Sequence, residues 1–130
     1  MPASNTNLRD SIPYCEVFYN GTLLKRFDQN QKDFNLHLRT RQMRSSDVLT
    51  ITYFEDVVMN SCENNLKIKD KDGREIKVIM IDELNYIDTY RLEAKEISRL
   101  ADKSESKKLN FFVRYGQFTY NKFLFRLHID

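Results

Sequence analysis

The sequence predicts an all-β, mainly antiparallel fold: a two-sheet β-sandwich of about 7–9 strands with one short helix near residues 95–102. β-Branched and aromatic residues, including nine Phe and seven Tyr, come in short alternating runs separated by turn residues. Such runs are typical of half-buried strands. No helical patterns long enough for crossover connections alternate with these runs, which favours antiparallel sheets packed face to face.

Length and composition fit one soluble globular domain. The chain has 130 residues, the usual size of a single domain, and no apolar run approaches the roughly 18 residues of a membrane-spanning helix. With 31% charged and 41% hydrophobic residues, the chain is too apolar for a disordered tail and too polar for a membrane protein. We therefore expect a polar lead-in over residues 1–12 and a single β-sandwich domain over residues 13–130.

The first hairpin is predicted by Asn20-Gly21, which separates the strand segments Tyr14–Tyr19 and Thr22–Phe27. A type I′ turn needs positive φ at both central residues, and Asn-Gly is the strongest short signal for it. The two-residue loop predicts Glu16 opposite Lys25, an attractive pair. One face of the hairpin then carries Tyr14, Phe18, Leu23 and Phe27, and the other carries Cys15, Val17, Tyr19 and Leu24. Because a sandwich strand needs only one apolar face, we expect the spare face to stay partly exposed until a partner covers it.

Two further strands are predicted at Phe34–Arg39 and Val48–Phe54, where apolar and polar residues alternate. In the second of them, Leu49, Ile51 and Tyr53 are expected to point inward. The overlapping stretch Asn35–Ser46 is basic and contains no acid, and we interpret it as a solvated loop.

A second hairpin is predicted from Leu66–Asp70 and Arg74–Ile81. A three-residue loop over residues 71–73 sets Ile68 against Ile76, whereas a two-residue loop would set Ile68 against Lys77. Matching apolar with apolar favours the three-residue loop, with its glycine left-handed at a bulge.

Residues 87–101 fit two patterns. A strand Thr89–Ala94 followed by a short helix Lys95–Asp102 uses both periodicities and is preferred to one continuous helix. Two strands, Leu109–Tyr115 and Phe123–Ile129, then close the chain. In the last strand one face is expected to carry Phe123, Phe125, Leu127 and Ile129.

The layout is similar to immunoglobulin-like and cupredoxin-like sandwiches, an architecture that does not by itself imply a function. A blue-copper centre would need two His, a Cys and an axial ligand, but no His or Met closely follows Cys62. We therefore expect no metal and no cofactor. His37 and His128 fall on the polar sides of their strands, outside any triad motif. The chain is accordingly expected not to be an enzyme.

The net charge, the two cysteines and the N-terminal residues bear on which classes of partner and which cellular compartment the chain is compatible with. A net charge of +2, from 21 basic and 19 acidic residues, lacks the strongly basic field of a dedicated nucleic-acid binder, so no nucleic-acid partner is expected. Cys15 and Cys62 either form one bridge or stay free, and the sequence leaves both open. The N-terminal residues show no secretory signal. The localisation is left open, since an extracytoplasmic location fits if a leader was removed.

Two hypotheses about function follow. The leading one is a non-enzymatic protein-interaction or structural module, an accessory domain or subunit of a larger cell-envelope, secretion or similar assembly, whose partner is another protein or a second copy. Its candidate contact residues are Tyr14, Val17, Phe18, Leu23, Leu24, Val57, Val58 and Met59. The alternative is a small-ligand or carbohydrate-binding sandwich that uses exposed aromatics near residues 115–125. Its candidate residues are Tyr115, Phe118, Tyr120 and Asn121.

Overall fold

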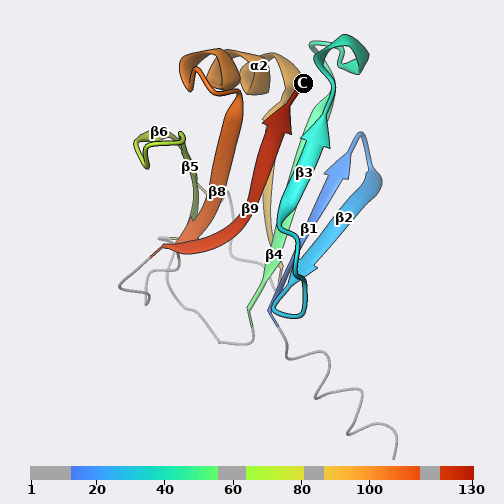
Figure 1. Cartoon of the computed structure of the whole chain (residues 1–130). Coiled ribbons are helices and arrows are strands. Elements are labelled where there is room, and N and C mark those ends of the chain that lie inside the picture. Colours follow the sequence, from blue (N-terminus) through green and yellow to red (C-terminus); the bar gives the residue numbers. More distant parts are fainter. Residues whose placement is uncertain (1–12, 56–63, 81–86, 115–120) are drawn as a thin grey trace, which may run out of the picture.

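The computed structural model of the chain describes residues 13–55, 64–80, 87–114 and 121–130. Within these ranges, nine strands form two sheets that pack face to face over a shared apolar core (Figure 1). The predicted two-sheet β-sandwich is therefore confirmed. No helix in the described ranges is long and apolar enough to cross a bilayer.

The first sheet has four antiparallel strands in the order β2-β1-β4-β7. Their bounds are β1 Tyr14–Tyr19, β2 Thr22–Asp28, β4 Val48–Phe54 and β7 Asp88–Glu93. In β4 the side chains of Leu49, Ile51 and Tyr53 are buried in the core, as the alternation predicted. The edges of this sheet are β2 and β7.

The second sheet has five strands in the order β3-β9-β8-β5-β6. Their bounds are β3 Asn35–Leu38, β9 Lys122–Ile129, β8 Lys108–Arg114, β5 Asn65–Lys69 and β6 Glu75–Met80. The short strand β3 runs parallel to β9, and the other pairs are antiparallel. The strand predicted at Phe34–Arg39 is confirmed as β3, and the rest of the basic stretch 35–46, expected to be a solvated loop, is mainly exposed and contains a 3-10 helix, Thr40–Gln42.

The helix α2 (Ala94–Lys103) follows β7 without a break and lies across one end of the sandwich (Figure 1). It buries Ala94, Ile97, Leu100 and Ala101, which share one side of the helix. The strand-then-helix prediction is confirmed, although the helix is longer than expected, and the continuous-helix alternative is wrong.

Three stacked phenylalanine rings join the two sheets through the core. The rings of Phe27 on β2 and Phe125 on β9 lie nearly parallel with centroids 5.2 Å apart, and Phe111 on β8 stacks 4.5 Å from Phe125. All three side chains are buried. Stacked pairs add about 0.5–1.5 kcal/mol beyond the free energy of burial, so this stack stabilises the packing of one sheet on the other.

The two predicted glycine turns have the expected backbone. Asn20 and Gly21 have φ values of 49° and 85°, and Gly73 has a φ of 83°. These positive values fit a type I′ turn in the first hairpin and a left-handed glycine in the second.

The two predicted cross-strand registers are wrong beyond the pairs nearest the turns, because each of these hairpins contains a β-bulge. In the first hairpin the extra residue is Leu24, so Glu16 lies opposite Arg26 instead of Lys25. Its carboxylate is 3.7 Å from the Arg26 guanidinium. In the second hairpin the extra residue is Ile76, so Ile68 lies opposite Lys77. A bulge re-aims every side chain beyond it.

The third bulge changes which residues of β9 face the core. Its extra residue is Leu124, because Phe111 pairs with Phe125 and Phe112 pairs with Phe123. Leu124 is buried, whereas Phe123 is 41% exposed. The expectation that Phe123 shares the inner face with Phe125 is therefore wrong.

Candidate functional site

The first hairpin presents one side to the core and the other to the surface. Cys15 and Val17 are buried in the core, so Val17 is not accessible to a partner. Tyr14 and Phe18 alternate with them and are partly exposed on the outer side. Leu23 pairs with Phe18 and is 49% exposed. The spare face expected from the sequence is thus the Tyr14–Phe18–Leu23 side. The placement of Phe27 on that face is wrong, because the bulge sets Phe27 opposite Cys15 and buries it in the core.

We call the outer side of the four-stranded sheet around these residues the hairpin face. Thr50 and Thr52 of β4 lie directly beside Phe18 and Glu16, so short polar side chains border the apolar ones. At one end, Tyr14 stacks on Phe54 with centroids 5.3 Å apart, and the Arg26 guanidinium lies 4.0 Å from the Tyr14 ring centroid. The hairpin face is a mixed surface, in which apolar side chains lie beside threonines and beside oppositely charged residues such as Glu16 and Arg26.

Leu24 lies at the bulge on the edge strand and is 41% exposed. It lines a shallow groove with Tyr19, Leu36 and Met43, and thus opens towards β3 instead of joining the hairpin face. The remaining predicted contact residues, Val57, Val58 and Met59, lie outside the described residues.

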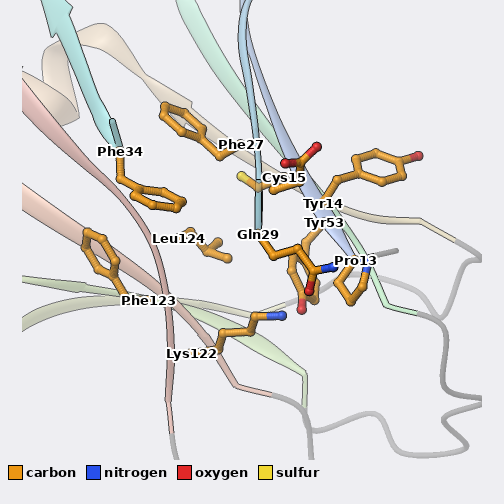
Figure 2. Close-up of a pocket in the computed structure, with 11 residues that line it drawn as sticks. Pro13, Tyr14, Cys15, Phe27, Gln29, Phe34, Tyr53, Lys122, Phe123 and Leu124 are labelled. Carbon is orange, nitrogen blue, oxygen red and sulfur yellow. The ribbon is translucent and has the colours of Figure 1, made fainter. Parts of the chain in front are cut away.

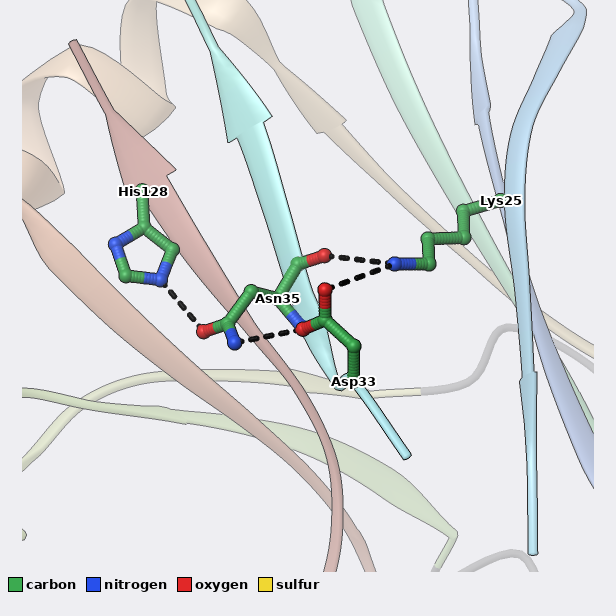
Figure 3. A network of polar contacts seen from close by, with 4 residues as sticks. All are labelled: Lys25, Asp33, Asn35 and His128. Carbon is green, nitrogen blue, oxygen red and sulfur yellow. Dashed lines mark hydrogen bonds and ion pairs between the residues drawn. The ribbon is translucent and has the colours of Figure 1, made fainter. Parts of the chain in front are cut away.

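The edge of β2 is tied to the other sheet by Lys25. Its Nζ donates a hydrogen bond to the Asn35 carbonyl oxygen at 3.2 Å and lies 3.8 Å from Asp33 Oδ2 (Figure 3). A lysine and a bulge on an edge strand both hinder pairing with another chain. The first hairpin is therefore better suited to contacts through its side-chain face than to strand addition.

A pocket of about 160 Å³ opens at the end of the sandwich away from α2 (Figure 2). Phe27, Phe34, Tyr53 and Leu124 form its apolar wall. Lys122 supplies one cation, with its Nζ 5.4 Å from the Tyr53 ring centroid and 4.0 Å from Glu55 Oε2. Cavities of about 150 Å³ hold a ring the size of benzene, so the pocket suits a small, mainly apolar ligand.

Of the residues proposed for ligand binding, the structure describes Asn121. It is partly buried next to Lys122 in the chain, and its Oδ1 has no hydrogen-bond partner among the described residues. Tyr115, Phe118 and Tyr120 lie outside the described residues. The pocket therefore adjoins the predicted ligand segment in sequence, but of its apolar wall the sequence predicted only Tyr53 to point inward and did not place Leu124 on the inner face.

Cys15 faces this pocket as a free, buried thiol (Figure 2). Burial, helped by the neighbouring Glu16 carboxylate, raises the pKa of the Cys15 thiol far above its usual value. Since the thiolate is the reactive form, Cys15 is poorly suited to act as a nucleophile.

The two histidines have partners that the sequence did not reveal. The parallel pairing of β3 and β9 places His37 beside His128, and their rings stack with centroids 4.5 Å apart. His128 Nε2 donates to Asn35 Oδ1 at 2.7 Å (Figure 3), and His37 Nδ1 lies 3.6 Å from Asp130 Oδ2. Burial, and then the neighbouring His37, lower the pKa of His128.

This pair does not belong to a metal-binding group among the described residues. Within the described ranges no three His, Cys, Asp or Glu side chains are grouped closely enough to hold a metal ion.

The fold so far defines a β-sandwich with an exposed apolar face and a small pocket. No protein-family model matches the chain, and no curated protein is significantly similar to it.

Proposed function

We propose that this chain is a non-enzymatic protein-interaction or structural module, an accessory domain or subunit of a larger cell-envelope, secretion or similar assembly. The observation that carries the proposal is the exposure of Leu23, 49%, directly opposite Phe18 on the outer side of the sheet. Aliphatic and aromatic side chains of this kind form the centre of protein interfaces when they are grouped. The immunoglobulin-like or cupredoxin-like layout remains part of this proposal.

The partner is another protein or a second copy, and it docks on the side chains of the hairpin face. Strand addition to β2 is disfavoured because Lys25 and the Leu24 bulge protect that edge. Docking through the face leaves the backbone pairing of β1 with β2 and β4 intact, so the domain keeps its fold whether or not the partner is bound.

The test is a charged double variant of the hairpin face, Phe18→Lys with Leu23→Glu. We expect loss of self-association in sedimentation velocity, or loss of the stoichiometric partner in purified complexes, with an unchanged circular dichroism spectrum. The matched control is Val78→Lys with Met80→Glu, since these residues are 37% and 55% exposed on the other sheet. Equal loss in the control, or an effect of neither variant, contradicts the proposed interface.

The pocket supports a second candidate function, binding of a small ligand. Its size and its aromatic wall favour a small apolar ring over a carbohydrate. A fragment screen by ligand-observed NMR tests this, with Leu124→Trp as the variant that fills the pocket. Fragments that bind both forms equally would not occupy the pocket.

A further inference from the structure

The outer side of the five-stranded sheet collects Lys and Arg side chains from three strands, β5, β8 and β9. Inward residues such as Leu66, Ile68, Leu109 and Phe111 are buried, so the alternate positions face outward. The outward Lys and Arg residues are Lys67, Lys69, Lys108, Arg114 and Arg126, and His37 and His128 lie beside them. We call this surface the basic face.

The charges on this surface are mostly unbalanced. On the outward positions of its described strands, the five Lys and Arg side chains meet one carboxylate, Glu75, whose Oε1 lies 3.3 Å from Lys67 Nζ. A second carboxylate, Asp130, follows β9 and lies beside His37. The hairpin face differs, because its strands present two basic residues, Arg26 and Arg91, and three acidic ones, Glu16, Asp28 and Glu93. The fold thus separates charges that nearly cancel in the whole sequence.

Two aromatic rings lie among these cations. The bulge at Leu124 turns Phe123 outward, opposite Phe112 of β8, and the two rings meet edge to face with centroids 5.5 Å apart. Phe123 is 41% exposed, and the Lys69 ammonium lies 4.8 Å from the Phe112 ring centroid. The rings and the cations therefore occupy neighbouring positions on one sheet.

We propose that the basic face binds single-stranded nucleic acid. Sheet surfaces of this kind stack bases on aromatic rings while Lys and Arg contact the phosphates. The side chains of Phe123 and Phe112 provide the stacking surface, and Lys67, Lys69 and Arg126 flank it for the backbone. Base stacking favours unpaired strands over a duplex, whose bases are stacked internally. The near-neutral composition predicted no such partner, because composition does not record which face a charge occupies.

Fluorescence anisotropy with labelled oligo-U and oligo-dT of about 15 nucleotides tests this proposal. We expect a plot of the logarithm of the association constant against the logarithm of the salt concentration to have a slope of about −3.5 if all five Lys and Arg side chains contact phosphates. Lys69→Gln with Arg126→Gln reduces the slope to about −2. Phe123→Leu, which keeps apolar bulk but removes the ring, weakens binding about fivefold or more.

The matched control is Arg91→Gln with Lys95→Gln, which removes the same charge from exposed sites away from the basic face. This control should keep most of its affinity for the oligonucleotides. The charged variant of the hairpin face, Phe18→Lys with Leu23→Glu, should keep it too, so the nucleic-acid proposal and the proposed protein interface are tested independently. Lack of binding at low salt overturns the inference, and so does binding to phosphatidylserine vesicles alone. Duplex DNA bound as tightly as the single strands, with no effect of Phe123→Leu, also overturns it.

Discussion

The Tyr19 hydroxyl donates a 2.6 Å hydrogen bond to Asp47 Oδ2, which links the end of β1 to the start of β4. The same carboxylate accepts hydrogen bonds from the Asn20 side chain at 3.0 Å and from the Arg44 backbone N–H at 2.9 Å. These donors lower the pKa of Asp47 to about 2. Burial and the bond to the Asp47 carboxylate raise the pKa of Tyr19 to about 12. Asp47 thus holds the first turn in place.

Asp47→Asn should lower the melting temperature at pH 7 because the charged acceptor is lost. The folded pKa of Asp47 lies below the ordinary carboxylate value, so its contribution is present above about pH 4 and is lost as the pH falls towards 2. The difference in melting temperature between the wild type and Asp47→Asn should therefore shrink across that window. A constant difference from pH 7 to pH 2 would contradict this role.

Gly73→Ala should destabilise the domain by about 1 kcal/mol. Gly73 has a φ of 83°, and no heavy atom within 4 Å would meet an added Cβ, so the loss is conformational and not steric. Urea denaturation measures it. Gly73→Asn is the control and should cost less, since Asn tolerates the left-handed region better than Ala. A neutral Gly73→Ala would show that the turn adopts another conformation.

Cys15 should resist thiol reagents in the folded protein. Its side chain is 1% exposed, and burial raises its pKa, so both access and the thiolate fraction are small. Labelling with Ellman's reagent at pH 8, in a Cys62→Ser background, should be slow and become fast in denaturant. Rapid labelling without denaturant would mean that the pocket admits the reagent to the thiol.

His128 should titrate below the ordinary histidine pKa of 6.5. Because the folded pKa is lowered, the stabilising contribution is complete above about pH 6.5 and is lost as the pH falls through the folded value. Two-dimensional NMR of the imidazole signals measures the titration. His37→Gln removes the neighbouring ring and should raise the pKa of His128, while burial still keeps it below 6.5. An unchanged pKa in that variant would exclude coupling between the two rings.

Strand positions and turns were predictable because they depend on local pattern. The alternation in Val48–Phe54 gave the bounds of β4, and Asn20-Gly21 and Gly73 marked turns that need positive φ. The change of period after residue 94 likewise indicated, to within one residue, where a strand gives way to α2. These signals require no knowledge of which strands are neighbours.

Bulges were not predictable, because they depend on how a whole sheet fits the opposite one. The alternation around Phe123 places it with Phe125, yet packing inserts Leu124 into the core and turns Phe123 outward. In the first hairpin the Leu24 bulge likewise sets Glu16 opposite Arg26. A β-bulge does not change the alternation of apolar and polar residues in the sequence, so the alternation does not reveal it.

By itself, the sequence determined a β-sandwich, its glycine turns, and a first hairpin with more apolar residues than one core face needs. The tertiary structure decided that Val17 lies in the core and that Phe18 and Leu23 lie outside. It also brought His37 to His128 and gathered lysines of separate strands on one surface. The physical reason is that strand pairing and sheet packing are non-local, so residues far apart in the chain become neighbours only when the two sheets close over the core.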